Sequence, residues 1–127
     1  MRRSKLSSQM KKVLVIDDDP DILEAVQMVL SSDGYESEGT TKGEETFEYV
    51  QNHKPDLIIL DVLLSGNDGR NICKALKQDK STQHIPVIMI SAHPTAREST
   101  KECGADSFIS KPFSVSGLLA EVGKFIE

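Results

Sequence analysis

The chain has 127 residues and a formal net charge of −5, and its length fits one domain with a core of its own. Five of the 15 basic residues, but none of the 20 acidic ones, lie before Val13, so the rest of the chain is strongly acidic and should repel nucleic acid. No apolar run is long enough to cross a membrane, and the basic start lacks the apolar stretch of a signal peptide. We therefore expect a cytoplasmic protein that binds neither nucleic acid nor membranes.

The basic start of the chain is typical of a solvated, flexible end. We predict a flexible tail at residues 1–10 and one domain at residues 11–127. The two cysteines, Cys73 and Cys103, do not have metal-ligand spacing. They are interpreted as reduced thiols of an intracellular protein.

Short, continuous apolar runs predict strands that are covered on both faces. In chain order these runs are residues 13–16, 57–60, 87–90 and, more weakly, 108–109. A poorer strand is expected at residues 35–38, where polar side chains indicate the edge of a sheet.

Helical patterns follow the strands, and most begin at a residue that can accept a hydrogen bond from the first turn. The predicted caps are Asp19 before Pro20, Thr41 with Glu44 at capping-box spacing, Asp68, and Ser114. Residues 94–103 are polar on almost every side, so we expect a marginal, mobile helix there, ended by Gly104. Strands and helices alternate five times, which predicts an α/β fold with a parallel sheet between two layers of helices.

Ligands of such sheets bind beyond the carboxyl ends of the strands, and polar residues stand at those ends. They are Asp17-Asp18-Asp19, Asp61, Ser91-Ala92 and Lys111-Pro112. Each has an ordinary explanation by itself, Asp19 as a helix cap for example, but four strand ends together favour a site. Carboxylates that meet repel each other unless a cation lies among them, and oxygen ligands suit Mg²⁺. Acids, a metal, an ammonium and a hydroxyl make up the chemistry of phosphoryl transfer.

Over residues 11–126 the sequence resembles the receiver domain of bacterial two-component response regulators of the chemotaxis-regulator type. The motifs that carry the resemblance are VLVIDDDPD, PDLIILD followed by GNDG, IPVIMISAH, GAD and FISKPF. The resemblance implies a flavodoxin-like, doubly wound (βα)5 fold with strand order 2-1-3-4-5. It also implies a signalling phosphoacceptor rather than an enzyme with turnover.

The resemblance further implies a role for each site residue. Asp61 is the phosphorylated aspartate, and Mg²⁺ is held by Asp17, Asp18, Asp61 and the Leu63 carbonyl. The phosphoryl oxygens are held by Ser91, Lys111 and the amides of Val62 and Ala92. Ser91 and Phe108 form the switch, and the Lys111–Pro112 bond is expected to be cis. Where the family usually has proline, four residues after the phosphoacceptor, stands Ser65, which we expect to loosen the loop without contacting a ligand.

The resemblance implies a sensor histidine kinase or a histidine phosphotransfer protein as the phosphoryl donor. Output is expected through the face of the fourth helix, fifth strand and last helix. Because the chain has no room for an effector domain, it is read as a stand-alone regulator, a relay intermediate or a fragment of a hybrid kinase. Leu63 and His93 flank the expected path of an attacking water, and neither can align one, so we predict slow hydrolysis of the phosphorylated form.

One alternative is a haloacid-dehalogenase-type phosphatase with Asp17 as nucleophile and Asp19 as acid–base. It leaves Asp61 and the GNDG motif unexplained, and turnover of a phosphate ester would distinguish it. A flavodoxin-like flavin protein is discarded, because three aspartates after the first strand would repel the flavin phosphate.

Overall fold

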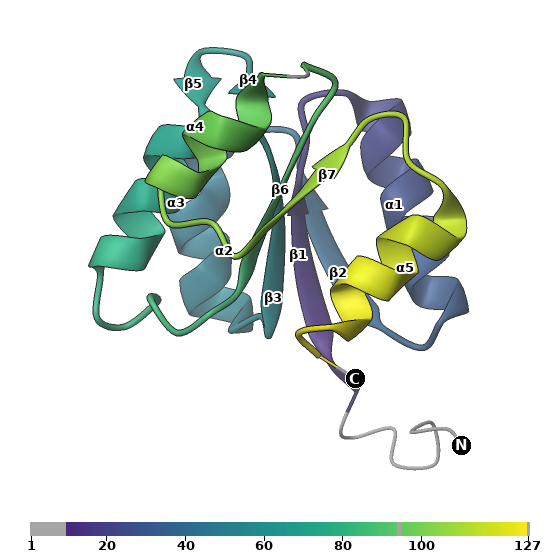
Figure 1. Ribbon diagram of the computed structural model, residues 1–127. Coiled ribbons are helices and arrows are strands. Elements are labelled where there is room, and N and C mark those ends of the chain that lie inside the picture. Colours follow the sequence, from purple (N-terminus) through teal and green to yellow (C-terminus); the bar gives the residue numbers. More distant parts are fainter. Residues whose placement is uncertain (1–9, 94, 127) are drawn as a thin grey trace.

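The structure, a computed structural model, describes residues 10–93 and 95–126. Five parallel strands form one sheet in the order β2-β1-β3-β6-β7, which confirms the predicted order 2-1-3-4-5 (Figure 1). The strands are β1 (Lys12–Ile16), β2 (Glu36–Thr40), β3 (Leu57–Asp61), β6 (Val87–Ser91) and β7 (Ser107–Ser110). The edge strand β2 therefore begins one residue later than predicted and runs two residues further.

Helices cover both faces of the sheet. They are α1 (Pro20–Ser32), α2 (Thr46–His53), α3 (Gly69–Gln78), α4 (Ala96–Glu102) and α5 (Val115–Gly123). Helices α1 and α5 lie on one face, and α2, α3 and α4 lie on the other (Figure 1). No helix in the described residues is both long and apolar enough to span a bilayer.

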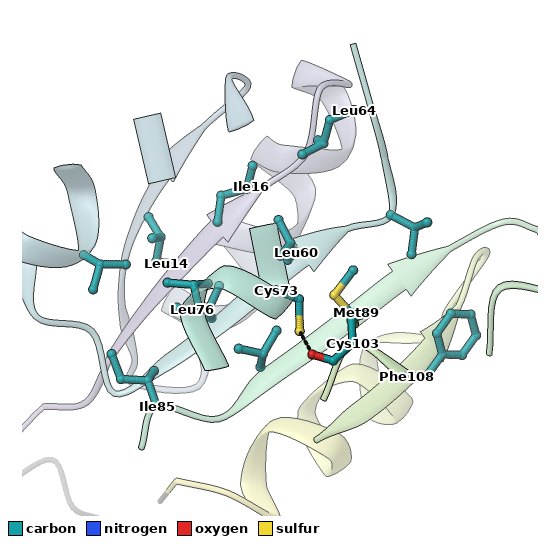
Figure 2. Close-up of a cluster of buried hydrophobic side chains, with 14 of the residues drawn as sticks. Leu14, Ile16, Leu60, Leu64, Cys73, Leu76, Ile85, Met89, Cys103 and Phe108 are labelled. Carbon is teal, nitrogen blue, oxygen red and sulfur yellow. Dashed lines mark hydrogen bonds between the residues drawn. The ribbon is translucent and has the colours of Figure 1, made fainter. Parts of the chain in front are cut away.

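Each central strand divides its side chains between two cores, because successive residues of a strand point to opposite faces. In β3, Ile58 and Leu60 join the core under α2 and α3, whereas Leu57 and Ile59 join the core under α1 and α5. The first core also holds both cysteines as free, buried thiols, and Cys73 Sγ donates to the Cys103 carbonyl oxygen at 3.6 Å (Figure 2). This double burial explains why the strands read as continuous apolar runs.

Three of the four predicted helix caps are confirmed. Asp19, Asp68 and Ser114 accept hydrogen bonds from backbone N–H groups in the first turns of α1, α3 and α5. These caps depend only on residues two or three positions away, so the local sequence is enough to predict them.

The capping box predicted at Thr41 and Glu44 is wrong. A 3₁₀ turn, η2 (Gly43–Glu45), precedes α2, and no side chain caps either element. The Thr40 hydroxyl instead donates to Glu45 Oε1 at 2.6 Å and accepts from the Lys42 amide at 3.0 Å. Thr40, the buried last residue of β2, therefore stabilises the turn in place of the predicted Thr41.

The helix predicted at residues 94–103 is the shorter α4, which buries only Ala96 and Thr100. Gly104, with φ of +90°, ends it as predicted, since glycine adopts this conformation without strain. Pro94, the first residue of the predicted helix, and residues 1–9, which make up most of the predicted tail, lie outside the described residues.

A small antiparallel hairpin directly after β3 was not predicted either. Its strands are β4 (Leu63–Leu64) and β5 (Asn67–Asp68), joined by Ser65 and Gly66. Gly66 has φ of +76°, which a two-residue turn commonly requires. The hairpin lies at the same end of the sheet as the carboxyl ends of the strands (Figure 1).

Candidate phosphoacceptor site

Three carboxylates meet where β1 and β3 end. Asp17 follows the last residue of β1, and Asp61 is the last residue of β3. One oxygen from each of Asp17, Asp18 and Asp61 lies within 4.8 Å of the others. Asp17 and Asp61 are buried and Asp18 is half-buried. The structure therefore brings together the three acids that the sequence predicted as metal ligands.

Lys111 supplies the nearest positive charge. Its Nζ lies 3.0 Å from Asp17 Oδ2 and 3.4 Å from Asp61 Oδ2. Burial by itself would lower the pKa of Lys111, but hydrogen bonding and attraction from the two carboxylates outweigh this effect and raise it. The ammonium therefore stays charged at neutral pH. The Lys111–Pro112 bond is cis, as predicted.

The surroundings of Asp61 disfavour the charged form of its carboxyl. Burial, together with the negative charge of Asp17, raises the pKa of Asp61 to about 6, against the opposing influence of Lys111. The backbone of Leu63 also lowers the pKa of this carboxyl, to a smaller extent. One lysine is thus not enough to neutralise the acids, and the cluster retains an excess of negative charge.

The donor set fits a divalent cation that prefers oxygen ligands. Among the described residues, Asp17 Oδ2 is the one buried side-chain oxygen without a hydrogen-bond donor in suitable orientation, although Lys111 lies beside it as an ion-pair partner. Asp17 Oδ1 accepts from the Asp19 amide at 3.0 Å, which fixes the orientation of the carboxylate. An oriented, incompletely satisfied carboxylate beside two further acids is what such an ion requires.

A cavity of about 200 Å³ is bordered by the two residues that follow Asp61 and by the end of β6. Its lining includes Val62, Leu63, Arg70, Ser91 and His93. Ser91 is the last residue of β6 and is buried, and its Oγ accepts from the His93 amide at 3.0 Å. The predicted hydroxyl therefore borders an open space that it shares with Val62 and Leu63, the two residues directly after Asp61.

Comparison with known proteins identifies the family. The profile of the response regulator receiver domain matches residues 13–123. The chain belongs to this family. The cyanobacterial regulator RpaA of Synechocystis, described as a DNA-binding dual master transcriptional regulator, is 36% identical over 115 residues, which make up 89% of this chain and 48% of RpaA. The regulatory protein PhoP of Bacillus subtilis, which controls alkaline phosphatase synthesis, is 38% identical over 114 residues, or 88% of this chain and 47% of PhoP.

Solved structures agree with this assignment. A response regulator of Chloroflexus aurantiacus superposes with a TM-score of 0.88 at 32% identity, covering 92% of this chain and 98% of the other. The chemotaxis response regulator CheY4 of Vibrio cholerae superposes with a TM-score of 0.86 at 28% identity, covering 93% and 100%. The receiver domain described here spans about half the length of RpaA and PhoP. None of these matches supports the phosphatase alternative.

The Val62 amide, predicted to hold a phosphoryl oxygen, has a backbone partner in this structure. It donates to the Ile90 carbonyl at 3.0 Å and thereby extends the pairing of β3 with β6. The strand pairing beyond residue 60 decides which amide is free, and the sequence does not reveal where that pairing ends.

The expectation that Ser65 contacts none of the predicted metal ligands is wrong. Ser65 Oγ donates to Asp18 Oδ2 at 3.0 Å, across 47 residues of sequence. The two residues meet because the hairpin folds back toward the loop between β1 and α1. The only signal available in the sequence was the absence of the usual proline.

Gly69 is a site residue that the sequence analysis missed. A Cβ added at Gly69 would lie 2.0 Å from the Asp61 carbonyl oxygen. The Gly69 amide donates to the Val62 carbonyl at 2.7 Å, so the start of α3 packs directly against the backbone of the phosphoacceptor loop. Glycine at the first helical position, directly after the cap Asp68, was the available signal, because glycine is unfavourable inside helices.

The predicted switch residue Phe108 belongs to the core under α2 and α3, at its α4 end (Figure 2). Its ring is only 9% exposed, and the Arg97 guanidinium of α4 lies 4.8 Å from the ring centre. A second arginine, Arg70, links α3 to α4 by donating to Ser99 Oγ at 3.0 Å while it pairs with Asp68. Any inward turn of Phe108 would therefore start from a ring that is already largely buried under Arg97.

Proposed function

We propose that this receiver domain accepts one phosphoryl group on Asp61, with Mg²⁺ held by Asp17, Asp18, Asp61 and the Leu63 carbonyl. The observation that carries the proposal is the buried Asp61 carboxylate, which lies among two further acids and the Lys111 ammonium. The family makes a phosphohistidine of a sensor kinase or of a phosphotransfer protein the expected donor. The domain signals by changing conformation rather than by turning over a substrate.

In this proposal an Asp61 carboxylate oxygen attacks the phosphorus of the phosphohistidine. The new O–P bond forms as the P–N bond breaks, and the imidazole nitrogen leaves with the bonding electron pair. The metal, when bound, neutralises charge on the carboxylates and on the phosphoryl oxygens. Lys111 remains protonated and pairs with one phosphoryl oxygen, and the Ser91 hydroxyl donates to another within the cavity beside Asp61.

Phosphorylation by a small donor tests this proposal. Incubation with acetyl phosphate and Mg²⁺ should increase the intact mass by one phosphoryl group, and omission of the metal should prevent the gain. Asp61→Asn should remain unmodified. Asp79→Asn is the matched control, since Asp79 is an exposed aspartate at the opposite end of α3. Full modification of Asp61→Asn would assign the phosphoryl group to another residue.

The proposed output surface is the face of α4, β7 and α5. Ser91 and Phe108 lie on neighbouring strands, β6 and β7, and Phe108 contacts α4 through Arg97. A displacement of Ser91 toward the phosphoryl group would therefore reach α4 first. Amide NMR spectra recorded with and without beryllofluoride should show shifts along these three elements, and shifts confined to residues near Asp61 would contradict the proposal.

We also propose that the phosphorylated form is long-lived. Leu63 is 59% exposed and has no polar side-chain atom, and His93 Nδ1 lies 2.8 Å from Thr95 Oγ1. Neither side chain is arranged to align a water for attack on the phosphorus. The double variant Leu63→Asn/His93→Glu should lose the phosphoryl group faster than the wild type, whereas His84→Glu, at an exposed histidine far from the site, should not. An equal or slower loss in the double variant would contradict the proposal.

The acidic domain is proposed to act in the cytoplasm without binding nucleic acid or membranes itself. RpaA and PhoP, each about twice as long as the matched segment, are named as transcriptional regulators. Their shared segment is the receiver domain, so DNA binding is assigned to the part that the match does not cover.

A further inference from the structure

The three acids of the site are held in two different ways. Asp17 and Asp61 share the Lys111 ammonium, and Asp17 also accepts a hydrogen bond from the Asp19 amide. Among the described residues, Lys111 forms ion pairs with Asp17 and Asp61 but not with Asp18. Within the described part of the chain, Ser65 Oγ is the one hydrogen-bond donor to the Asp18 carboxylate, at 3.0 Å from Oδ2.

Ser65 lies in the turn of the β4–β5 hairpin, and both strands of this hairpin are fixed to the rest of the domain. The pairs Leu63–Asp68 and Leu64–Asn67 close the hairpin on both sides of Ser65 and Gly66. Leu64 is buried in the core under α2 and α3, which anchors the first strand.

The second strand of the hairpin is anchored as well. Asp68 caps α3 and accepts a bidentate pair of hydrogen bonds from Arg70, at 2.9 and 2.6 Å. The Ser65 hydroxyl therefore sits at the tip of a turn whose ends are both tied to the domain. Its bond to Asp18 is less easily lost than one made by a free loop.

A hydrogen bond to one carboxylate oxygen leaves the other oxygen available to a cation. Groups that bond to a ligand in this way orient it, and their loss typically weakens metal binding about 10- to 100-fold. Without Ser65 the half-buried Asp18 side chain could rotate toward water. The proline that the family usually has at this position could not donate such a bond.

We propose that Ser65 is a positioning residue for the metal: its hydroxyl holds Asp18 so that the free carboxylate oxygen faces the cation among the three acids. This inference rests on the proposed binding of Mg²⁺ by Asp17, Asp18 and Asp61. It adds a residue from the hairpin tip, four positions after the phosphoacceptor, to the machinery of the site.

Mg²⁺ titration by calorimetry tests the inference on the full chain without phosphoryl donor. Ser65→Ala should bind Mg²⁺ about 5- to 10-fold more weakly than the wild type, below the usual range because Ser65 is exposed. Ser65→Thr, which keeps the hydroxyl, should restore most of the affinity. Ser81→Ala is the matched control, since the exposed Ser81 donates to Asp79 Oδ1 at 2.7 Å away from the site.

The rate of phosphorylation by acetyl phosphate separates positioning from a general structural effect. For Ser65→Ala the rate should fall at low Mg²⁺ and return to the wild-type value at saturating Mg²⁺. Unchanged or tighter Mg²⁺ binding by Ser65→Ala, or an equal loss in Ser81→Ala, would overturn the inference. A wild type that binds no Mg²⁺ would instead overturn the proposed metal site itself, so the two failures are distinguishable.

Discussion

Asp17 and Asp61 lie at the ends of strands that are buried on both faces, and we call this part of the site the acid side. The part of the site next to α4, the α4 side, rests on a helix of seven residues that buries only two of them. On the acid side, like charges are forced together, and the sheet holds them there at a cost in free energy. On the α4 side, little apolar area is buried, so a displacement there costs little. The contrast indicates that the acid side is the more rigid of the two and that the α4 side is displaced more easily. The predictions below test this division.

The largest effect is expected from Lys111→Ala. The variant leaves two buried carboxylates without their ammonium, so the free energy of unfolding at pH 7 should fall by about 3–5 kcal/mol in the absence of metal. Urea unfolding in EDTA measures the loss, and added Mg²⁺ should recover part of it. Lys124→Ala, which removes an exposed pair with Glu121, should change stability by less than about 1 kcal/mol. Similar losses in the two variants would mean that repulsion between the Asp17 and Asp61 carboxylates does not destabilise the acid side.

Gly69→Ala should destabilise the protein by about 3 kcal/mol, because its Cβ would meet the Asp61 carbonyl oxygen at 2.0 Å and force the backbone apart. The same unfolding experiment measures the change. Gly123→Ala is the control, since nothing lies within 4 Å of its Cβ and alanine favours the helix. If Gly69→Ala were as stable as the wild type, the backbone at Asp61 would be able to move aside, and the acid side would not be rigid.

Asp61→Asn should stabilise the protein at pH 7 in the absence of metal, by about 1–2 kcal/mol. Burial, with Asp17 beside it, raises the pKa of Asp61 from 3.8 to about 6, so the folded state binds the proton more tightly than the unfolded state. The stability that this proton contributes is fully present below pH 3.8 and is lost as the pH rises through about 6. Unfolding measured from pH 4 to 7 should show this fall in the wild type, and a smaller one in Asp61→Asn. An equal fall in both would assign the titration to another group.

The smallest effect on stability is expected on the α4 side. Arg97→Ala removes the guanidinium from the Phe108 ring and should cost about 0.5–1 kcal/mol. The same change should enlarge the motion of Phe108, because the ring loses its cover. NMR signals of the ring should therefore respond more strongly to beryllofluoride in Arg97→Ala than in Lys101→Ala, an exposed residue on the same helix. A response no larger than that of the control would show that Arg97 does not restrain the switch.

Local sequence determined the central strands of the sheet and the starts of three helices. Continuous apolar runs predicted the central strands, and Asp19, Asp68 and Ser114 predicted three helix starts, because strand burial and capping depend on neighbouring residues. The parallel order of the strands then brings Asp17, Asp61 and Ser91 to one edge of the sheet.

Only the tertiary structure decided which atoms meet at that edge. The Val62 amide pairs with Ile90 of β6, the Asp61 carbonyl leaves room only for glycine at position 69, and Ser65 reaches Asp18 across 47 residues. Each of these contacts depends on the path of the loop after Asp61 and on the packing that anchors it. Such contacts join residues far apart in the chain, so no pattern of neighbouring residues specifies them.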